Sequence, residues 1–562
     1  MNTVFFLVMR RMRGPLLLLS FVYAVATLGL TMIPGVDDRG DLWYMDLFHA
    51  FYFVSFMGTT TGFGEIPYAF SDAQRMWTLI FIYITVATWI YTIGALIRLL
   101  SSDLLRNALT IYQFERQVGQ IREPFTLICG YGDSGSKLVS AARRRLLRVT
   151  VIEIRQDRID ALMLDDSDVF VPGLCGDASI PGNLMLAGIN HPQCQYVVAL
   201  TNDNEANLHI AITAKVMNPG VQVICRADAH DIEANMASFG TDYIIDPFDS
   251  FARDLGLATY APYQFLLSLW LRSEPGDELT EVQIVPEGRW IVCGYGRFGR
   301  AIVDEMLSHG LSVQVIEPDI SRKNLPADTI FGDGTGEEIL TAAGVADAVG
   351  IIAGTDDDSN NLSIIVTALG LNPGLFVIVR QNEQANQALF RASPASVAME
   401  PSAVIARKIR TILTNRTIDE FLSLARARDD RWARSLTNRI RDLGQQTMPE
   451  TWEVIINGDD AAAVTGAIRN GKQMMIGHLL QDYTQREDTL PVIALFHAND
   501  SGAFCLPPIH TLLSEGDKLL FIGEGLAYWK MKWTLANDSA LEYVLTGENQ
   551  PQTWAGKLLW RK

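Results

Sequence analysis

The chain has little of what a disulfide-linked, histidine-dependent or nucleic-acid-binding protein needs. Its six cysteines include no CxxC pair, which excludes an obvious disulfide framework and fits a reducing compartment. Only eight histidines occur, and none stands in a recognisable catalytic setting. The formal net charge is -18, so nucleic acid and anionic lipid headgroups are not expected partners.

Charge is also absent from two long stretches near the N-terminus. Residues 14–33 and 77–97 contain no charged side chain, and each run is long enough to cross a hydrocarbon core of roughly 30 Å as a helix. A signal peptide and a buried core helix are the alternatives. However, no small-residue cleavage site closes the first run, and a signal peptide does not explain the second. We therefore expect two membrane spans.

Basic residues flank both runs on the side away from the connector between them: Arg10, Arg11, Arg13, Arg98 and Arg106. The connector, residues 34–75, holds six acidic and two basic side chains. The positive-inside bias therefore predicts a multi-pass protein of the cell (inner) membrane with both termini in the cytoplasm. Residues 1–110 carry seven basic and seven acidic side chains, so the net negative charge lies in the remainder.

Between the two runs stands the sextet Thr60-Thr61-Gly62-Phe63-Gly64-Glu65. Glycines at alternate positions let a backbone turn its carbonyl oxygens toward one axis, where they can replace the water shell of a cation. The aromatic segment 42–57 before it is long enough for a short helix ending at the sextet. The succession of helix, half-helix, filter and helix resembles the two-helix potassium channels over roughly residues 14–100.

This resemblance implies that four chains form one pore and that K⁺ is held by carbonyls of Thr60, Thr61, Gly62 and Phe63, with Gly64 completing the filter. The sequence departs from the family's Thr-Val-Gly-Tyr-Gly-Asp at Thr61, Phe63 and Glu65. Because the ligands are backbone atoms, selectivity should survive, while the rigidity of the filter is in question. Gly94, inside the second run, is either a gating hinge or a close packing contact.

Beyond Asn107 the chain repeats itself. Residues 127–135 read LICGYGDSG and residues 291–299 read IVCGYGRFG, an offset of 164. An acid closes the next apolar strand in each copy, Glu153 and Glu317, at the same offset. Two copies of GxGxxG, each with a strand before it and an acid after it, predict a duplicated α/β Rossmann-like unit.

The pair resembles the cytosolic RCK (KTN) domains that regulate potassium channels and uptake systems. The resemblance implies a homotetramer whose eight domains form one ring, with crossover helices over 246–272 and 400–424. A pair of such domains alone would suggest a transporter subunit, but the fused filter argues against this. The expected division is a pore domain 1–106, a first RCK domain 107–285, a second at 286–445 and a small α+β C-terminal lobe at 446–562.

A pyrophosphate is expected at the glycine loops, where a helix N-terminus favours anions. The expected ligand-binding residues are Gly130, Gly132, Gly135, Glu153 and Asp177 in the first copy, and Gly294, Gly296, Arg297, Phe298, Gly299, Glu317 and Asp333 in the second. Arg297 and Arg300 favour the second copy, whereas Asp133 would repel phosphate in the first. The acids disfavour a 2′-phosphate, so NAD or an adenine nucleotide (ADP or AMP) is expected. Either copy could instead retain the fold for packing alone.

Calcium is a further expectation from the resemblance. Candidate carboxylates are Asp133, Asp177, Asp356, Asp357 and Asp358, although three consecutive acids usually form a solvated helix start.

The sequence thus predicts a ligand-gated potassium channel that is not an enzyme. It has no arginine ladder, so steep voltage gating is not expected. The alternatives are a weakly selective cation channel and a membrane-tethered NAD-dependent oxidoreductase, which would leave residues 42–65 unexplained.

Overall fold

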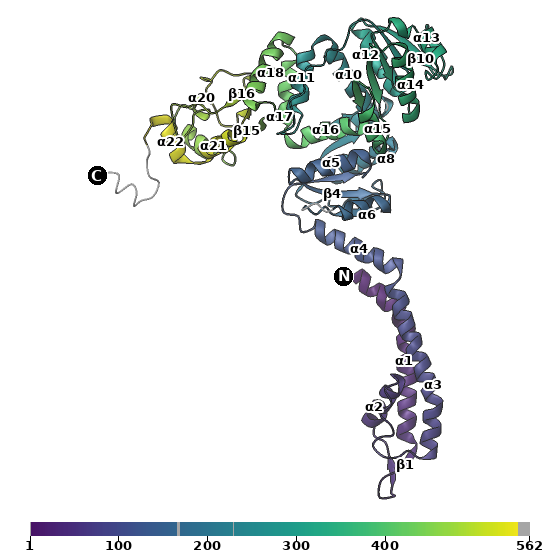
Figure 1. Ribbon diagram of the computed structural model, residues 1–562. Coiled ribbons are helices and arrows are strands. Elements are labelled where there is room, and N and C mark those ends of the chain that lie inside the picture. The colour runs from purple at the N-terminus through teal and green to yellow at the C-terminus, as the bar shows by residue number, and fades with distance from the viewer. Residues whose placement is uncertain (1, 166–168, 229, 549–562) are drawn as a thin grey trace, which may run out of the picture. The chain divides into compact units, whose positions relative to one another are not determined.

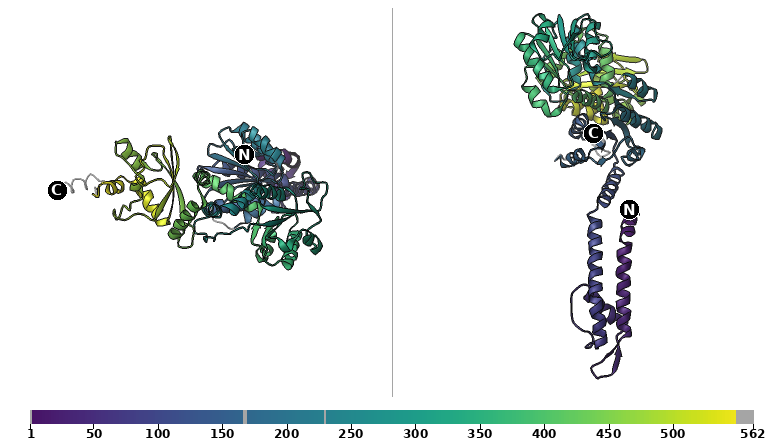
Figure 2. Two further views of the ribbon diagram at one scale, coloured as in Figure 1. Left: turned by 90° about the horizontal axis from the view of Figure 1, so that it is seen from above. Right: turned by 90° about the vertical axis from the view of Figure 1, so that its right-hand side faces the viewer.

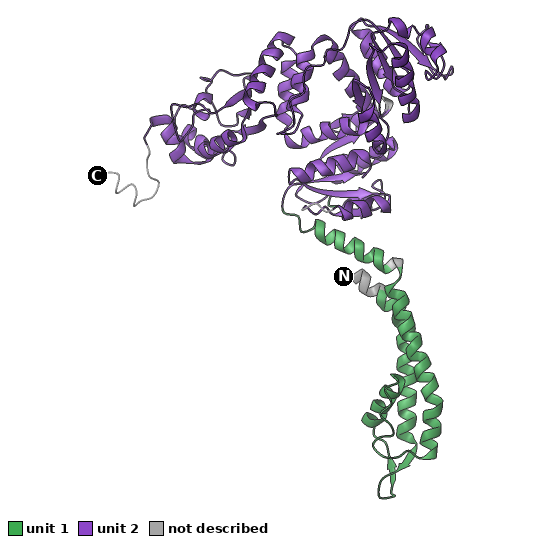
Figure 3. Cartoon of the chain, in the orientation of Figure 1, with its two compact units in different colours: residues 1–122, 186–188 green, residues 123–185, 189–562 purple. Residues whose placement is uncertain are grey.

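The computed structural model describes residues 2–165, 169–228 and 230–548, and the chain divides into two compact units (Figure 3). Unit 1 comprises residues 1–122 and 186–188, and unit 2 comprises residues 123–185 and 189–562. The two-span region and the Rossmann-like lobes predicted from the sequence are both present.

Unit 1 is built around two long apolar helices that lie side by side (Figures 1 and 2). Within the described residues, two segments are long and apolar enough to span a membrane, Val8–Met32 and Asp72–Leu100, with mean hydropathies of 1.9 and 2.0. The elements of unit 1 are α1 (Asn2–Met32), β1 (Pro34–Val36), β2 (Leu42–Tyr44), α2 (Leu47–Gly58), α3 (Asp72–Leu100) and α4 (Asp103–Val118).

The pairing of α1 with α3 depends on one glycine. A Cβ on Gly29 would lie 2.1 Å from the Trp77 ring, so only glycine lets the indole lie against α1, and Trp77 Nε1 donates to the Ala26 carbonyl at 3.1 Å. At the same end, Ser71 caps α3 and its hydroxyl donates to the Pro34 carbonyl at 2.9 Å. These contacts fix the register of the two helices.

The helix expected over residues 42–57 begins later than predicted. Residues 42–44 form β2, which pairs antiparallel with β1, and the Asp46 carboxylate accepts a bond from the His49 amide at 2.7 Å. An aspartate in this position caps a helix, so α2 begins at Leu47. Asp46 is visible in the sequence as a possible N-cap, but the aromatic residues before it led to an earlier predicted start.

In unit 2 the two copies of the glycine motif form two six-stranded parallel sheets with matching strand order, β5-β4-β3-β6-β7-β8 and β11-β10-β9-β12-β13-β14. This is the doubly wound order, in which the first strand is central and leads into the glycine loop. The first lobe contains β3 (Phe125–Cys129), α5 (Asp133–Arg144), β4 (Arg148–Glu153), α6 (Gln156–Leu164), β5 (Gly173–Cys175), α7 (Pro181–Leu186), β6 (Cys194–Ala199), α8 (Asn204–Met217), β7 (Gln222–Arg226), α9 (His230–Ser238) and β8 (Tyr243–Ile245).

The second lobe contains β9 (Arg289–Cys293), α12 (Arg297–Ser308), β10 (Ser312–Glu317), β11 (Ile330–Phe331), α13 (Glu337–Ala342), η1 (Val345–Asp347), β12 (Gly350–Ala353), α14 (Asp358–Leu371), β13 (Phe376–Arg380), η2 (Gln384–Asn386), α15 (Gln387–Ala392) and β14 (Val397–Met399).

Each lobe is followed by a helix that packs on the other lobe. Helix α10 (Pro247–Tyr260) follows the first lobe, and its buried Phe248, Ala252 and Leu255 belong to the second lobe's core beside α12. Helix α16 (Pro401–Thr414) follows the second lobe and buries Ile405 and Ile409 in the first lobe's core beside α5. The lobes therefore exchange helices reciprocally.

The C-terminal lobe is a four-stranded antiparallel sheet of order β15-β18-β16-β17. One apolar cluster joins it to the helices that continue the crossovers, and another lies under its own helices. The elements are α11 (Pro262–Leu271), α17 (Arg416–Ala425), α18 (Asp430–Gly444), β15 (Glu450–Ile455), α19 (Ala462–Arg469), α20 (Ile476–Leu479), β16 (Val492–Asn499), β17 (Gly502–Cys505), β18 (Lys518–Gly523), α21 (Gly525–Ala536) and α22 (Asp538–Thr546).

Candidate functional site

The sextet after α2 has an alternating backbone. Thr60, Gly62 and Gly64 have φ values of 60°, 66° and 99°, in the left-handed region that residues other than glycine rarely adopt. The residues between them, Thr61 and Phe63, are not in that region. Left-handed residues at every second position turn successive carbonyls toward one side, which is the geometry that a ring of backbone ligands requires.

The first residues of the sextet are hydrogen-bonded to the end of α2. The amides of Thr60 and Thr61 donate to the carbonyls of Met57 and Phe56 at the end of α2, at 3.1 and 2.9 Å. All residues from Thr60 to Glu65 are exposed in a single chain, and Phe63 is 67% exposed with its ring edge-on to Phe56 at 5.6 Å. The sextet is therefore uncovered in the single chain.

Glu65 braces the outer end of the sextet. Its carboxylate accepts bonds from Arg75 Nε and Nη2 at 2.8 and 3.1 Å, and from the Phe70 amide at 2.8 Å. The bonds from Arg75, with the Phe70 amide, hold the pKa of Glu65 below its ordinary value. The brace is therefore intact above that ordinary value and is lost only as pH falls through the lowered pKa.

We expect Glu65→Gln to loosen the filter, because the neutral amide replaces a bidentate carboxylate. Because an exposed ion pair is weak in water, the effect should be modest, and K⁺ flux through the sextet should fall by no more than about fivefold. The measurement is K⁺ and Na⁺ flux into liposomes. Asp72→Asn is the control, because Asp72 lies 3.8 Å from the same arginine but is fully exposed. Equal effects of both substitutions would contradict a bracing role for Glu65.

Gly94 lies in uninterrupted helix within α3. A Cβ built on it meets nothing within 4 Å in its own chain, so no packing contact inside the described chain requires a glycine there. Its role as a hinge stays a prediction.

The two glycine loops of unit 2 have nearly the same geometry. Gly130 and Gly294 have φ values of 104° and 94°. A Cβ on Gly135 would lie 2.1 Å from the Gly130 carbonyl oxygen, and a Cβ on Gly299 would lie 1.9 Å from that of Gly294. The first glycine of each motif thus allows the turn, and the third lets the helix approach the loop.

The glutamates at the ends of β4 and β10 hold these loops in place through hydrogen bonds. Glu153 is 4% exposed and accepts bonds from the amides of Tyr131 at 2.6 Å and Arg155 at 3.0 Å. Glu317 is 1% exposed and accepts equivalent bonds from Tyr295 at 2.5 Å and Asp319 at 3.0 Å. Both oxygens of Glu153 and Oε2 of Glu317 retain capacity for one more bond, so positioning the loop and binding a ribose hydroxyl are compatible.

Each acid has an arginine nearby that was not predicted from the sequence. Arg158 and Arg322 are separated by 164 residues, the offset of the glycines and the acids, and this spacing could have revealed them. Arg158 Nη1 lies 3.7 Å from the Glu153 carboxylate, beyond hydrogen-bond distance. Arg322 Nε donates to Glu317 at 2.9 Å. The first copy therefore has the more available cation.

A cavity of about 650 Å³ lies over the first glycine loop. It is at the carboxyl ends of the strands, where doubly wound folds bind ligands. Among the residues that line it are Gly130, Gly132, Glu153, Arg155, Arg158, Asp177, Asn202 and His209. Asp177 accepts from the Ser179 amide and hydroxyl at 2.8 and 2.7 Å, whereas Asp133 is exposed at the start of α5 and does not line the cavity.

In the second copy, two predicted ligand contacts have other partners. Phe298 is fully buried against Phe248 and Phe251 and cannot touch a bound molecule. Arg297 donates to the carboxylate and carbonyl of Asp228 in the first lobe, at 3.0 and 3.1 Å. The sequence could not reveal this, because the partner lies 69 residues away in the other lobe.

Gly296 and Asp333 of the second copy stay predicted ligand contacts. Gly296 begins α12 as its N-cap, and Asp333 is exposed. The Thr335 amide donates to Asp333 at 3.0 Å and lowers the pKa of that carboxyl.

The carboxylates proposed for calcium do not gather. Asp357 caps α14, and the buried Asp358 accepts bonds from Asn382, Glu383 and Asn386. Within the described residues, the three acids whose oxygens lie within 4.8 Å of one another are instead Glu233, Asp246 and Asp249. Burial raises the pKa of Asp246 to about 6. None of the predicted candidates, Asp133, Asp177, Asp356, Asp357 and Asp358, belongs to this group of described residues, so calcium binding by them stays a prediction.

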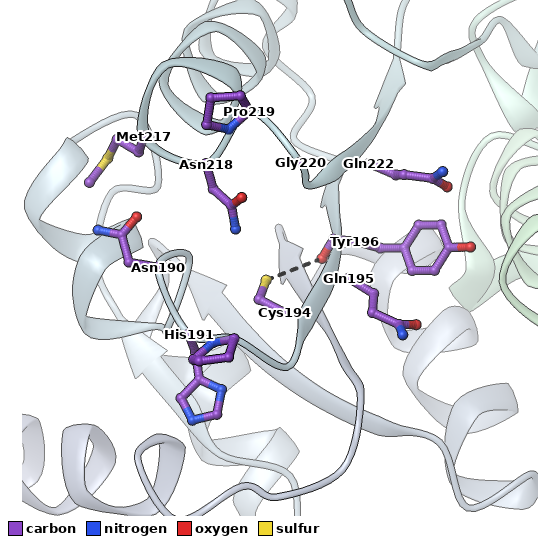
Figure 4. A pocket seen from close by; sticks show the side chains of 11 residues that line it. Asn190, His191, Cys194, Gln195, Tyr196, Met217, Asn218, Pro219, Gly220 and Gln222 are labelled. Atoms are coloured by element: carbon purple, nitrogen blue, oxygen red, sulfur yellow. Dashed lines mark hydrogen bonds between the residues drawn. The ribbon is translucent and has the colours of Figure 1, made fainter.

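Another cavity of the first lobe, of about 720 Å³, lies at the opposite edge of the sheet, where β6 and β7 begin (Figure 4). Asn190, Cys194 and Asn218 line it, and Asn218 Nδ2 donates to the Ile189 carbonyl at 2.9 Å. Because this edge is remote from the glycine loop, the cavity is separate from the candidate nucleotide site.

Comparison with known proteins identifies both lobes. The TrkA-N domain family matches residues 126–247 and 290–401, so the chain contains two TrkA-N domains. An uncharacterized protein of Methanothermus fervidus is 25% identical over 253 residues, which cover 44% of this chain and 38% of that protein. Potassium channel protein 1 of Methanocaldococcus jannaschii is 27% identical over 169 residues, 29% of this chain and 51% of that protein.

The chain thus spans about half or less of the length of these relatives. A solved structure described as the GsuK channel bound to NAD is 15% identical, with a TM-score of 0.49, over 95% of this chain and 100% of that chain.

Proposed function

We propose, from the premise that this chain is a tandem TrkA-N (RCK) protein with two candidate membrane spans, that it is a potassium-selective channel gated by nucleotide. In this proposal four copies surround one pore in the cell membrane, both termini are cytoplasmic, and eight TrkA-N domains form a gating ring. The proposed division is a pore domain 1–106, RCK domains 107–285 and 286–445, and a C-terminal lobe 446–562.

The observation that carries the proposal is the alternating backbone of the sextet between two apolar helices. Left-handed φ values at Thr60, Gly62 and Gly64 give a carbonyl ladder that needs no side-chain ligand. The Thr60 hydroxyl makes no hydrogen bond with another described residue of its chain, so it is free to supply the innermost ligands. A dehydrogenase has no use for such a segment.

For the nucleotide we favour the first copy, which reverses the preference drawn from sequence. Arg158 is available in the 650 Å³ cavity, whereas Arg322 is bonded to its acid and Arg297 is bonded to Asp228. The pyrophosphate of NAD, ADP or AMP would lie on the loop amides with Arg158 as its counter-charge, and Glu153 would accept from a ribose hydroxyl. The second copy would then act chiefly through packing.

Coupling is supported by the exchanged helices. A ligand that reshapes the first lobe acts on α16, which packs on α5, and α16 continues the second lobe. If each of four sites favours one ring state tenfold, the coupling sums to about 5.5 kcal/mol, enough to shift an equilibrium from 1:99 to 99:1.

Flux into liposomes containing the purified full chain tests the proposal. We expect K⁺ flux that excludes Na⁺ and changes on adding NAD, ADP or AMP to the ring side, with Ca²⁺ as a separate addition. Equal K⁺ and Na⁺ flux would support the weakly selective alternative. No flux, together with NAD reduction in the presence of an oxidisable substrate, would support an oxidoreductase instead.

Gly94→Ala tests the hinge. Alanine stabilises a helix interior by roughly 0.5–1 kcal/mol relative to glycine, so a bent open state of α3 should be less populated and nucleotide-responsive flux should fall several-fold. Gly14→Ala is the matched control, since Gly14 also lies in a long apolar helix with nothing within 4 Å of an added Cβ. Unchanged flux in the Gly94 variant would show that Gly94 does not act as a hinge.

A further inference from the structure

A third cavity of unit 2, of about 390 Å³, lies away from both glycine loops. Its walls come from α10, α11, α15, β14 and α16, so it sits where the two exchanged helices meet. Most of its lining is apolar, for example Phe251, Phe265 and Phe390. Its size and character are those of a small-molecule site.

Two arginines, Arg391 and Arg407, line this cavity, and Arg407 is the less exposed of the two. Arg407 of α16 lines it, and burial lowers the pKa of Arg407 below its ordinary value. Among the described residues, no side chain or carbonyl forms a hydrogen bond or ion pair with its guanidinium. Asp254 lines the same cavity, but it makes no ion pair with Arg407.

The neighbouring cations of α16 are all satisfied. Lys408 Nζ donates to the Ser250 hydroxyl at 2.6 Å, and Arg410 pairs with Glu274 at 2.8 Å. Arg272, which faces them, pairs with Asp419 at 3.0 Å. Arg407 is half-buried and forms no such bond among the described residues, so it is the cation of this helix that is left to pair with a ligand.

We propose that this cavity binds a small apolar carboxylate, whose head pairs with Arg407 and whose body fills the aromatic pocket between α10 and α16. A carboxylate suits the site because the planar guanidinium matches it bidentately. A single negative charge is also favoured over a phosphate dianion, because the carboxylates of Asp254, Glu281 and Glu400 line the same cavity. The ligand would lie between α10 and α16 and would act as an effector distinct from nucleotide.

The test is a fluorine NMR titration of the full chain in detergent with 4-(trifluoromethyl)benzoate, compared with its neutral amide. We expect saturable binding of the carboxylate. Arg407→Gln should weaken carboxylate binding at least about tenfold while leaving binding of the amide unchanged, because a charge-assisted pair is lost. Arg439→Gln, at an exposed arginine of α18, is the matched control and should alter neither probe.

A stability measurement separates a binding role from a structural one. Because Arg407 is half-buried and forms no hydrogen bond or ion pair through its guanidinium with another described residue, Arg407→Gln should leave the thermal midpoint close to that of the wild type. Ala403→Leu, which adds bulk at the cavity wall, should block both probes. Absence of saturable carboxylate binding, or equal carboxylate affinity in wild type and Arg407→Gln, would overturn the proposal. These readouts do not depend on ion conduction or nucleotide binding.

Discussion

Replacing Gly62 by alanine is expected to abolish potassium flux. Gly62 has φ 66° and an added Cβ would meet nothing within 4 Å, so the effect arises from backbone strain and not from a clash. The left-handed conformation costs a residue with a Cβ about 1–2 kcal/mol, or about 4–8 kcal/mol over four chains. If relaxation turns the carbonyls off the pore axis, K⁺ flux into liposomes should fall at least about a hundredfold.

Gly40→Ala is the control for this prediction. Gly40 lies in the turn between β1 and β2 with φ 86° and, like Gly62, has nothing within 4 Å of an added Cβ. Its substitution carries the same kind of backbone strain outside the sextet, so flux should be nearly unchanged. If both variants lose flux equally, the loss reflects general destabilisation and the filter assignment fails.

The second large effect is expected at Arg158. Its substitution by glutamine removes the available cation of the 650 Å³ cavity. A hydrogen bond to a charged group contributes about 1.5–3 kcal/mol. The affinity for ADP or NAD, measured by isothermal titration on the full chain, should therefore fall about 10- to 100-fold.

Arg322→Gln is the matched substitution in the second copy. Because Arg322 is already bonded to Glu317 at 2.9 Å, it should matter less for nucleotide binding. If Arg322→Gln causes the larger loss, the second copy is the nucleotide site, as the sequence alone had indicated. The pair of variants thus decides between the two lobes.

Local patterns in the sequence were sufficient to predict much of the architecture. Uncharged runs predicted the two long helices, and the offset of 164 predicted two equivalent sheets, because each signal lies within one or two elements. The start of α2 was misjudged because aromatic content outweighed the capping signal of Asp46.

The site was less predictable, because partners distant in sequence decide it. Arg297 was expected at a phosphate, but its position beside the loop says nothing about Asp228, which only folding brings within 3.0 Å. Phe298 follows the loop in sequence, yet the arrival of α10 from the other lobe buries it. Arg407 has no motif around it, and only the shape of the cavity distinguishes it from its paired neighbours.

The reciprocal exchange of α10 and α16 also bears on how this chain could be cut or shortened. Each lobe's core is completed by a helix that the other lobe's segment of the chain supplies. A fragment ending near residue 285 would keep α10 without the α12 face on which it packs, and would lack the isoleucines of α16 that cover α5. Such a half should be insoluble when expressed alone, whereas both halves produced together should reassemble. Neither lobe can therefore be deleted without removing a helix that completes the core of the other.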